Sequence, residues 1–374
     1  MPGIEKLFSE IADITYVSGR LISAKMLDNS DALLCRSITQ VNESLLDNSR
    51  VKFVGTATIG IDHLDIEWLN KKGIDWSNAA GCNAPAVGQY ILSAIAYWCI
   101  QKNRSIKDLT VGIIGAGNVG SMLTKYLTHF GINYKLCDPP LKELGDEREF
   151  TDLESILKCD VISIHVPITS AGEHPTHYLF SEHNLTRLNK NQLLINASRG
   201  AVIDNLALSD YLKSANSADC ILDVFENEPN INSLLVNQCI LATPHIAGHT
   251  LEGKLRGSWM IYAAFCKRFA LPLNRLETEL YPSNNLINLS GSSLEEDILS
   301  IYDICLDAML IDSKLIGSRL IASKSLKAIP NNEIKNQFDH LRKDATKLSN
   351  GYIRRDYTGW TVNNKNSILT IPTD

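Results

Sequence analysis

The sequence has no hydrophobic run long enough to cross a membrane. Its longest apolar stretch covers about residues 90–100, whereas a membrane-spanning helix needs about 20 apolar residues. The start of the chain also lacks a basic segment followed by an apolar core, which is the pattern of a secretory signal. We therefore expect a cytoplasmic protein that does not enter a membrane.

An excess of positive charge is also absent. The 374 residues include 36 Lys and Arg against 42 Asp and Glu, a formal net charge of −6. Nucleic acids and anionic membranes attract basic surfaces, so neither is expected as the main partner. The nine cysteines are odd in number and form no C-x-x-C pair, which disfavours disulfides and metal ligation. We predict free thiols and no bound metal.

Strands alternate with helices along most of the chain, which predicts an α/β fold with doubly wound parallel sheets. In the first part we expect a helix over 4–12 and short strands at 14–17, 31–36, 51–54 and 74–77. A mostly apolar helix at 86–103 follows, and then six strands at 110–115, 134–138, 161–165, 193–196, 218–223 and 240–243. Six strands at this spacing are typical of a dinucleotide-binding domain. A helix at 250–269 is long enough to return to the first part.

These patterns predict three domains. Residues 85–248 form a Rossmann-type domain, and residues 1–84 with 249–280 form a second, flavodoxin-like domain. The turn-rich stretch that begins at Tyr281 separates a third segment, residues 281–374, which has no glycine-rich loop. We expect this segment to be a small α+β accessory or association domain.

A glycine-rich loop follows the first strand of the predicted Rossmann domain. Gly115, Gly117 and Gly120 form a G-x-G-x-x-G motif between that strand and a predicted helix at 119–130. In such motifs the glycines allow a tight turn, close approach of a pyrophosphate and close packing of helix on strand. Asp138 follows the next strand, where a carboxylate binds the adenosine ribose and repels a 2′-phosphate. The motif therefore predicts NAD rather than NADP, although a glycine turn without a ligand would have the same sequence.

Three polar residues follow later strands, at the edge where open α/β sheets bind ligands. They are Arg199, Glu228 and His245. Oxidation of a 2-hydroxy acid needs a cation to hold the carboxylate, a base for the hydroxyl proton and a carboxylate to orient that base. Singly, each residue could be a loop cap, a solvated acid or a packed histidine. Together, in a nicotinamide-type domain, they predict a dehydrogenase site.

Over about residues 1–280, these motifs together resemble the D-2-hydroxyacid dehydrogenase family. Two narrower runs, Asp138-Pro-Pro140 and Leu251-Glu-Gly-Lys-Leu-Arg-Gly257, resemble the branch of that family that acts on a phosphorylated four-carbon acid. The resemblance implies NAD-dependent oxidation of 4-phospho-D-erythronate to (R)-3-hydroxy-2-oxo-4-phosphobutanoate, on the route to pyridoxal 5′-phosphate. It also implies a homodimer formed through residues 281–374.

The resemblance assigns Arg199, Glu228 and His245 as the catalytic set. The expected cofactor contacts are Gly115, Gly117, Asn118, Val119, Gly120, Asp138, Val166, Ala197, Ser198, Asp223 and Gly248. The expected substrate contacts are Ser37, Thr58 and His249, with Arg36 and Arg256 as candidates for the phosphate because of their charge.

Two features depart from the family pattern. His249 stands where the family usually has a tyrosine, so its charge would vary with pH. The chain also opens directly on its first helix, so the first strand of the substrate-domain sheet is expected to be missing, through a late coding start or a true loss. Two alternative functions stay open: a dehydrogenase for glycerate, lactate or 3-phosphoglycerate, and a non-enzymatic NAD-binding regulator.

Overall fold

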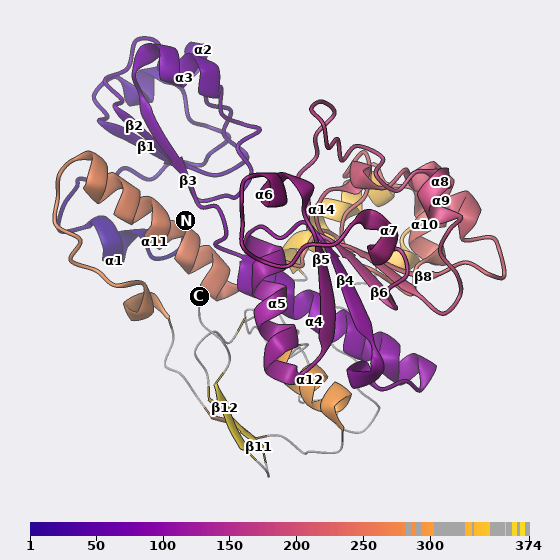
Figure 1. Ribbon diagram of the computed structural model, residues 1–374. Coiled ribbons are helices and arrows are strands. Elements are labelled where there is room, and N and C mark those ends of the chain that lie inside the picture. Colours follow the sequence, from indigo (N-terminus) through magenta and orange to yellow (C-terminus); the bar gives the residue numbers. More distant parts are fainter. Residues whose placement is uncertain are drawn as a thin grey trace. The chain divides into compact units, whose positions relative to one another are not determined.

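A computed structural model describes the fold over residues 1–281, 286–288, 293–302, 326–330, 333–344, 356, 361–364 and 367–370. The chain divides into two compact units (Figure 1). Unit 1 comprises Met1–Asn83 and Leu251–Asn284, and unit 2 comprises Ala84–Thr250 and Asn285–Asp374. Across the described residues, every helix is too short or too polar to span a lipid bilayer.

Unit 1 is built on a parallel sheet of three described strands in the order β1-β2-β3. The strands are β1 (Ala32–Cys35), β2 (Phe53–Thr56) and β3 (Asp75–Asn78), and the helices are α1 (Ile4–Phe8), α2 (Glu43–Leu46), α3 (Ile66–Lys72) and α11 (Leu251–Arg268). Helix α11 joins this unit, as expected from its length, and packs closely on β2. A Cβ atom on Gly55 would lie only 2.4 Å from Ile261 of α11. The small residue at the centre of β2 therefore allows the late helix to cover the sheet.

The expected strand at 14–17 is wrong, because residues 12–18 have no regular structure. Helix α1 likewise ends at Phe8 rather than at residue 12. Tyr16 is 64% exposed, and no described strand pairs with this segment, since the only partner of β1 is β2. Strand propensity without a neighbouring strand or a buried face does not produce a strand.

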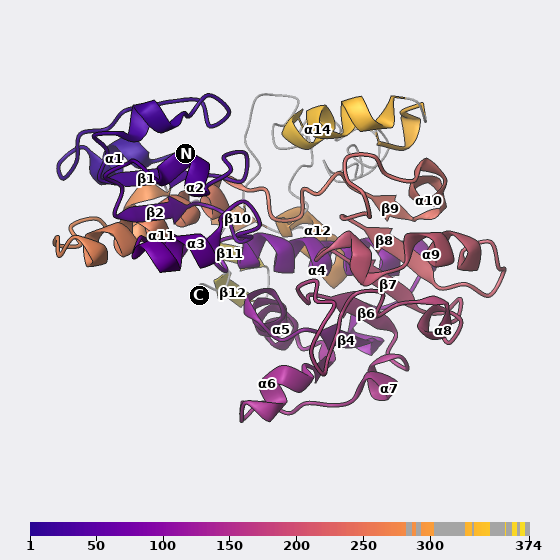
Figure 2. The same ribbon diagram turned by 90° about the horizontal axis from the view of Figure 1, so that it is seen from above.

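Unit 2 contains all six strands expected from the sequence. They are β4 (Thr110–Ile114), β5 (Asn133–Cys137), β6 (Val161–Ile164), β7 (Leu193–Asn196), β8 (Asp219–Leu222) and β9 (Leu241–Ala242). All pair in parallel, in the order β5-β4-β6-β7-β8-β9, and Figure 2 shows β4 and β6 to β9 in succession. The direction of winding reverses at β4, so the switch point lies at the carboxyl ends of β4 and β6, where such sheets bind ligands.

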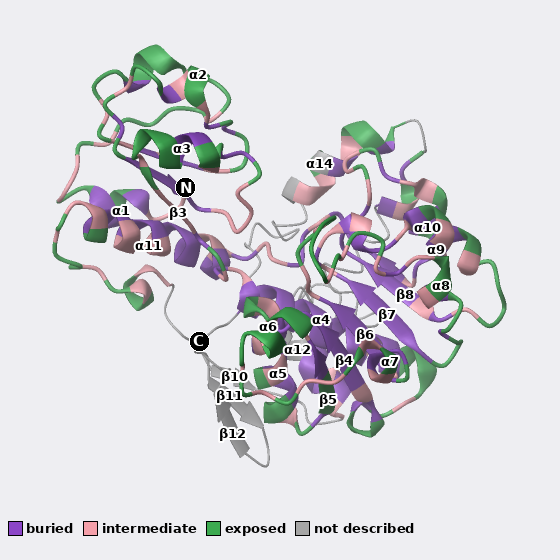
Figure 3. Cartoon of the chain, turned by 45° about the horizontal axis from the view of Figure 1, so that its top comes forward, coloured by how far each residue is buried: buried purple, intermediate pink, exposed green. Residues whose placement is uncertain are grey.

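Helices cover both faces of this sheet, and its strands are buried (Figure 3) except at the edge, where the first three residues of β5 are exposed. On one face lie α4 (Ala84–Lys102) and α5 (Asn118–Phe130), which pack with Ile113, Val161 and Ile195. On the other face lie α7 (Leu153–Ile156), α8 (Glu182–Leu185), α9 (Asn205–Tyr211) and α10 (Ser233–Gln238), which pack with Ile162 and Leu194. Neighbouring residues of the central strands thus alternate between two apolar cores, which explains why these strands are mostly apolar.

The described parts of residues 285–374 belong to unit 2. Helix α12 (Leu294–Tyr302) places Ile298 in the core around α4, and α14 (Ile334–Asp344) places Phe338 in the opposite core. Strands β10 (Leu286–Asn288), β11 (Thr361–Asn364) and β12 (Ser367–Thr370) form a small mixed sheet. Much of the expected C-terminal domain lies outside the described residues, so its role in dimerisation stays a prediction.

Candidate active site

The glycine-rich loop lies between β4 and α5, at the switch point of the six-stranded sheet. Gly115 has φ +92°, and a Cβ there would approach the backbone of His165 to 2.8 Å. A Cβ on Gly120 would lie 2.1 Å from the carbonyl oxygen of Gly115, so close packing excludes any larger residue. A Cβ on Gly117 would meet no described atom within 4 Å. Packing therefore requires two of the glycines, whereas Gly117 leaves open space beside the backbone.

The start of α5 fits an anionic ligand in that space. Gly117 is the N-cap residue, and the helix begins at Asn118. The first N–H groups of a helix have no acceptor inside the helix and carry the positive end of its dipole. This combination of a glycine cradle and a helix N-terminus is suited to a pyrophosphate. The residues present therefore fit NAD, with Gly117, Asn118, Val119 and Gly120 at the phosphates.

Asp138 lies directly after β5 and beside the glycine-rich loop. One carboxylate oxygen accepts a hydrogen bond from the backbone N–H of Ala116 at 2.8 Å, and the other accepts from Leu141 N–H at 3.0 Å. The second bond caps α6 (Pro139–Glu143). Both oxygens keep further lone pairs, so the carboxylate can also accept from ribose hydroxyls. Its contact with the cofactor stays a prediction.

Arg199, Glu228 and His245 lie on loops that follow β7, β8 and β9. These strands are neighbours and run in parallel, so the three loops emerge at one edge of the sheet. The first two loops touch directly, because a Cβ on Gly200 would lie 2.0 Å from the carbonyl carbon of Phe225. The fold thus brings together residues that are separated along the chain.

The imidazole of His245 is held by Glu228. The Nδ1 atom of His245 lies 2.7 Å from Oε2 of Glu228, while Oε1 accepts from the N–H of Phe225 at 2.8 Å. A carboxylate can only accept, so the proton of the imidazole lies on Nδ1 and Nε2 keeps a free lone pair. The His245 side chain is 34% exposed, so part of the imidazole is accessible from outside. This is the geometry of an oriented general base.

Asp223 organises the loop that carries His245. Its carboxylate is 1% exposed and accepts hydrogen bonds from Thr243 Oγ1 and from the N–H groups of Ile246 and Ala247, at 2.6, 2.8 and 2.9 Å. Its backbone carbonyl accepts from the N–H of His245 at 2.8 Å. Burial raises the pKa of this carboxyl group. The contact of Asp223 with the cofactor stays a prediction, and its framework role in the loop of His245 is an addition that the sequence does not indicate.

Arg199 is half-buried and presents a cation at the same edge. Its Nη1 donates to the carbonyl of Ser198 at 2.8 Å, and among the residues that the structure describes it forms no ion pair. Asn196 fixes the loop by donating to the carbonyl of Arg199 at 3.0 Å and accepting from the N–H of Ser198. A guanidinium held in this way is available for a substrate carboxylate.

The remaining expected residues of unit 2 lie on nearby loops. Val166 follows β6 at the switch point, and its Cγ1 would contact a Cβ on Gly115 at 2.9 Å. Ala197 lies between β7 and Arg199. Gly248 and His249 follow the His245 loop, and both are half-buried.

Among the substrate residues expected in unit 1, Thr58 belongs to a chain of hydrogen bonds. His63 Nε2 and Thr56 Oγ1 lie 2.8 Å apart, Thr56 Oγ1 and Thr58 Oγ1 lie 2.8 Å apart, and Thr58 Oγ1 donates to the carbonyl of Gly60 at 2.9 Å. The hydroxyl proton of Thr58 is thus used internally, and its oxygen can accept from a ligand hydroxyl. His63 is not expected from the sequence, because nothing local to it indicates a hydrogen bond to Thr56.

Three cationic side chains of unit 1 differ in their surroundings. Arg256 is 3% exposed, pairs with Glu277 at 3.0 Å and donates to the carbonyl of Cys82 at 2.7 Å. This burial argues against its expected contact with a phosphate. Lys254 is half-buried, and its pKa is lowered by burial and by the nearby charge of Arg36. Arg36 and the exposed Ser37 follow β1, and the proximity of the like charges of Lys254 and Arg36 was not expected.

The parallel six-stranded sheet, the glycine-rich loop at its switch point and the Arg–Glu–His set define an NAD-binding dehydrogenase of the D-2-hydroxyacid class. Residues 97–247 match the family model of the D-isomer specific 2-hydroxyacid dehydrogenase, NAD binding domain. Curated relatives narrow this class. The chain is 40% identical over 374 residues to the erythronate-4-phosphate dehydrogenase of Pseudoalteromonas atlantica, covering 98% of this chain and 94% of that protein. It is 44% identical over 303 residues to the enzyme of that name from Marinobacter nauticus, covering 79% and 78%. The chain belongs to the erythronate-4-phosphate dehydrogenase family.

Solved structures agree in fold. A D-lactate dehydrogenase from Aquifex aeolicus, complexed with NAD and lactic acid, matches with a TM-score of 0.53 and 23% identity over 75% of this chain and 96% of that one. The NAD⁺-bound 3-phosphoglycerate dehydrogenase of Entamoeba histolytica matches with a TM-score of 0.58 and 22% identity, over 72% and 90%. At this identity the likeness concerns the fold and not the substrate.

Proposed function

We propose that this protein oxidises 4-phosphoerythronate at C2 with NAD⁺. The observation that carries the proposal is the 2.7 Å bond between Glu228 and His245, in a chain that shares 40% identity with an erythronate-4-phosphate dehydrogenase over almost its whole length. That bond leaves a basic nitrogen at the edge of the sheet that also holds Arg199. The similarity selects the substrate, which the fold alone does not.

In this proposal, the hydroxyl group at C2 loses its proton to Nε2 of His245. Glu228 stabilises the imidazolium that forms, because its carboxylate accepts from Nδ1 in both protonation states. Arg199 holds the C1 carboxylate and stabilises negative charge on the oxygen at C2. The glycine-rich loop would hold NAD⁺, which would supply the acceptor for the hydride that leaves C2.

Unit 1 is proposed to supply contacts for the rest of the substrate. We assign the phosphate to Arg36 and Lys254, because Arg256 is already compensated by Glu277. Ser37 stays a proposed substrate contact, and the free lone pair of Thr58 suits a substrate hydroxyl. His249 is also kept as a proposed substrate contact.

Two finer assignments belong to the same proposal. We assign unit 1 to the flavodoxin-like substrate domain of the family, and residues 281–374 to subunit pairing in a homodimer. Light scattering of the purified protein tests the second assignment, and a monomeric mass at assay concentrations would overturn it.

The reaction itself is tested by NADH formation from 4-phosphoerythronate, with D-glycerate, D-lactate and 3-phosphoglycerate as competing candidates. Arg199→Ala and His245→Ala are expected to abolish most of the rate while NADH binding persists. If the wild-type protein oxidises one of the other three acids faster, that acid replaces 4-phosphoerythronate as the proposed substrate. If the wild-type protein binds NADH but oxidises none of these four acids, the result would favour the alternative function of a non-enzymatic NAD-binding regulator.

A further inference from the structure

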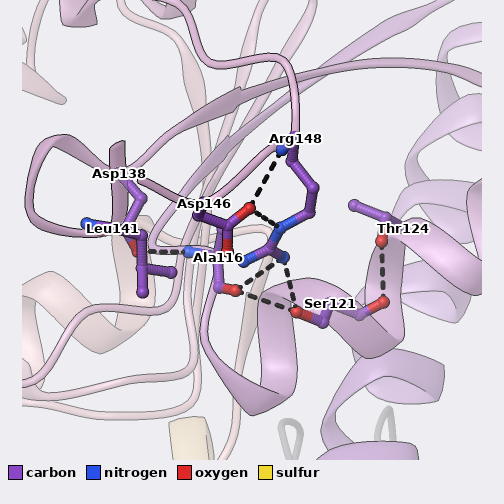
Figure 4. A network of polar contacts seen from close by, with 7 residues as sticks. All are labelled: Ala116, Ser121, Thr124, Asp138, Leu141, Asp146 and Arg148. Carbon is purple, nitrogen blue, oxygen red and sulfur yellow. Dashed lines mark hydrogen bonds and ion pairs between the residues drawn. The ribbon is translucent and has the colours of Figure 1, made fainter. Parts of the chain in front are cut away.

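Arg148 lies outside every residue assigned above, yet it reaches the glycine-rich loop. The chain leaves α6 and folds back along β5, where Phe150 bridges to Leu136 and the N–H of Thr151 donates to the Leu136 carbonyl at 2.7 Å. This return brings the Arg148 side chain beside Ala116 and Ser121 (Figure 4). A residue on the connection after β5 thereby contacts the connection after β4.

The guanidinium of Arg148 is held on two sides. Its Nε and Nη2 donate to the two carboxylate oxygens of Asp146 at 2.9 and 2.7 Å. Its Nη1 donates to the carbonyl oxygen of Ala116 at 2.9 Å and to Ser121 Oγ at 2.8 Å. The group also lies 5.5 Å from the ring centroid of Phe150. A planar fork with several fixed donors suits this bridging position, and a lysine cannot reproduce it.

These contacts fix the peptide groups of Ala116 from both sides. Its N–H donates to Asp138 at 2.8 Å, while its carbonyl oxygen accepts from Arg148 and, at 2.9 Å, from Ser121 Oγ. Its neighbours in sequence are Gly115 and Gly117, whose backbones have the greatest conformational freedom. The orientation of the loop therefore depends on these side chains, because the glycines do not restrict it.

An isolated ion pair on the surface contributes little to stability. The pair of Arg148 and Asp146 differs, because it is bidentate and because the same guanidinium also donates to the glycine-rich loop. Hydrogen bonds from Arg148 lower the pKa of the Asp146 carboxyl to about 2. Asp146 thus stays ionised at any pH used for an assay, and it anchors Arg148 throughout. Because the pKa of Asp146 is lowered on folding, the contribution of this ion pair to stability is complete above about pH 3.8 and is lost as the pH falls towards 2.

We propose that Arg148 is a positioning residue for the dinucleotide, which fixes the loop whose N–H groups receive the pyrophosphate. The inference rests on the proposed NAD-dependent function. It concerns binding rather than the chemical step, because Arg199, Glu228 and His245 lie on other loops. Loss of Arg148 should therefore weaken the cofactor complex and leave turnover at saturating NAD⁺ almost unchanged.

The test measures NADH affinity by fluorescence titration of the full chain, and KM for NAD⁺ against kcat. For Arg148→Met we expect about tenfold weaker NADH binding, the effect of losing one hydrogen bond to a charged group. Arg148→Lys should recover part of the affinity. Arg187→Met is the matched control, since Arg187 pairs with the exposed Glu154 away from the loop, and it should bind NADH as the wild type does. The double variant Ser121→Ala/Arg148→Met should lose less NADH-binding free energy than the sum of the losses in the two single variants, because both side chains bind the same carbonyl of Ala116.

The possible results distinguish a failure of the proposed role of Arg148 from a failure of the proposed function. If Arg148→Met binds NADH as tightly as the wild type, or if kcat falls as much as affinity, the inference is overturned. A wild type that binds no NADH overturns the proposed function and this inference with it. If Arg148→Met does not fold, as judged by circular dichroism, Asp146→Asn and Ser121→Ala carry the test, and unchanged affinity in both would also overturn the inference.

Discussion

Replacing Glu228 with glutamine changes one atom of the side chain that orients the base. Both carboxylate oxygens of Glu228 are in use: Oε1 accepts from Phe225 N–H at 2.8 Å and Oε2 from His245 Nδ1 at 2.7 Å. An amide has only one oxygen, so its NH₂ group must face one of these two donors.

If the NH₂ group faces the imidazole, Nδ1 must give up its proton and accept instead. The proton then lies on Nε2, the nitrogen that should receive the substrate proton, and the base is lost. If the NH₂ group faces Phe225, two donors oppose each other, which costs about 1–3 kcal/mol. General-base catalysis contributes about 10²–10⁴-fold. We therefore expect Glu228→Gln to lower kcat/KM by about 10³-fold, or about 4 kcal/mol of transition-state stabilisation.

The assay is the initial rate of NADH formation from 4-phosphoerythronate, together with NADH affinity, which should not change. Glu226→Gln is the matched control on the same loop. Glu226 accepts from Tyr178 OH and from Asn205 N–H, both at 2.8 Å. A hydroxyl can rotate and accept from an amide, so the control should stay within about threefold of the wild type. A Glu228→Gln variant that keeps more than about a tenth of the wild-type kcat/KM would refute the tautomer argument.

Three further predictions concern the cofactor loop and the substrate. Gly117→Ala should keep the wild-type melting temperature but weaken NADH binding, because the added Cβ fills the open space beside the loop. Gly120→Ala should lower the free energy of unfolding by about 1–3 kcal/mol, because its Cβ overpacks against Gly115. Thermal unfolding and NADH titration check both variants, and a destabilised Gly117→Ala would contradict the prediction. Arg199→Lys should lower kcat/KM by about 10²-fold, because a point charge cannot grip a carboxylate bidentately, and steady-state rates near wild type would remove Arg199 from the carboxylate. Lys254→Ala should raise KM for 4-phosphoerythronate by about tenfold without changing KM for NAD⁺, and an unchanged substrate KM would exclude Lys254 from the phosphate.

Much of unit 2 could be predicted because its signals are local. Strands β4, β6 and β7 are short apolar runs covered on both faces, so no alternation obscures their pattern. The glycine-rich loop and Asp138 stand at fixed places relative to two strands. Arg199, Glu228 and His245 each follow a strand, and parallel strands expose their carboxyl ends at one edge. Chain order was therefore enough to group these residues.

Unit 1 shows where such signals fail. The apolar residues at 14–17 have strand propensity, but a strand also needs a neighbour, and the sheet offers none to that segment. Arg256 has the charge that a phosphate requires, yet α11 turns it towards Glu277 and Cys82. Charge is visible in a sequence, whereas the partner that compensates it depends on which segments pack together.

The sequence by itself thus determined the class of the fold and the position of the glycine-rich loop, and it grouped the residues proposed for catalysis. Only the tertiary structure decided that Glu228 contacts His245 and that Asp223 holds the loop of His245. It also decided that His63 hydrogen-bonds to Thr56 and that Arg148 hydrogen-bonds to Ala116. The physical reason is the range of the interactions. Periodicity and turn chemistry act over a few residues, but hydrogen bonds are set by atoms that approach within 3 Å or so after distant segments have packed.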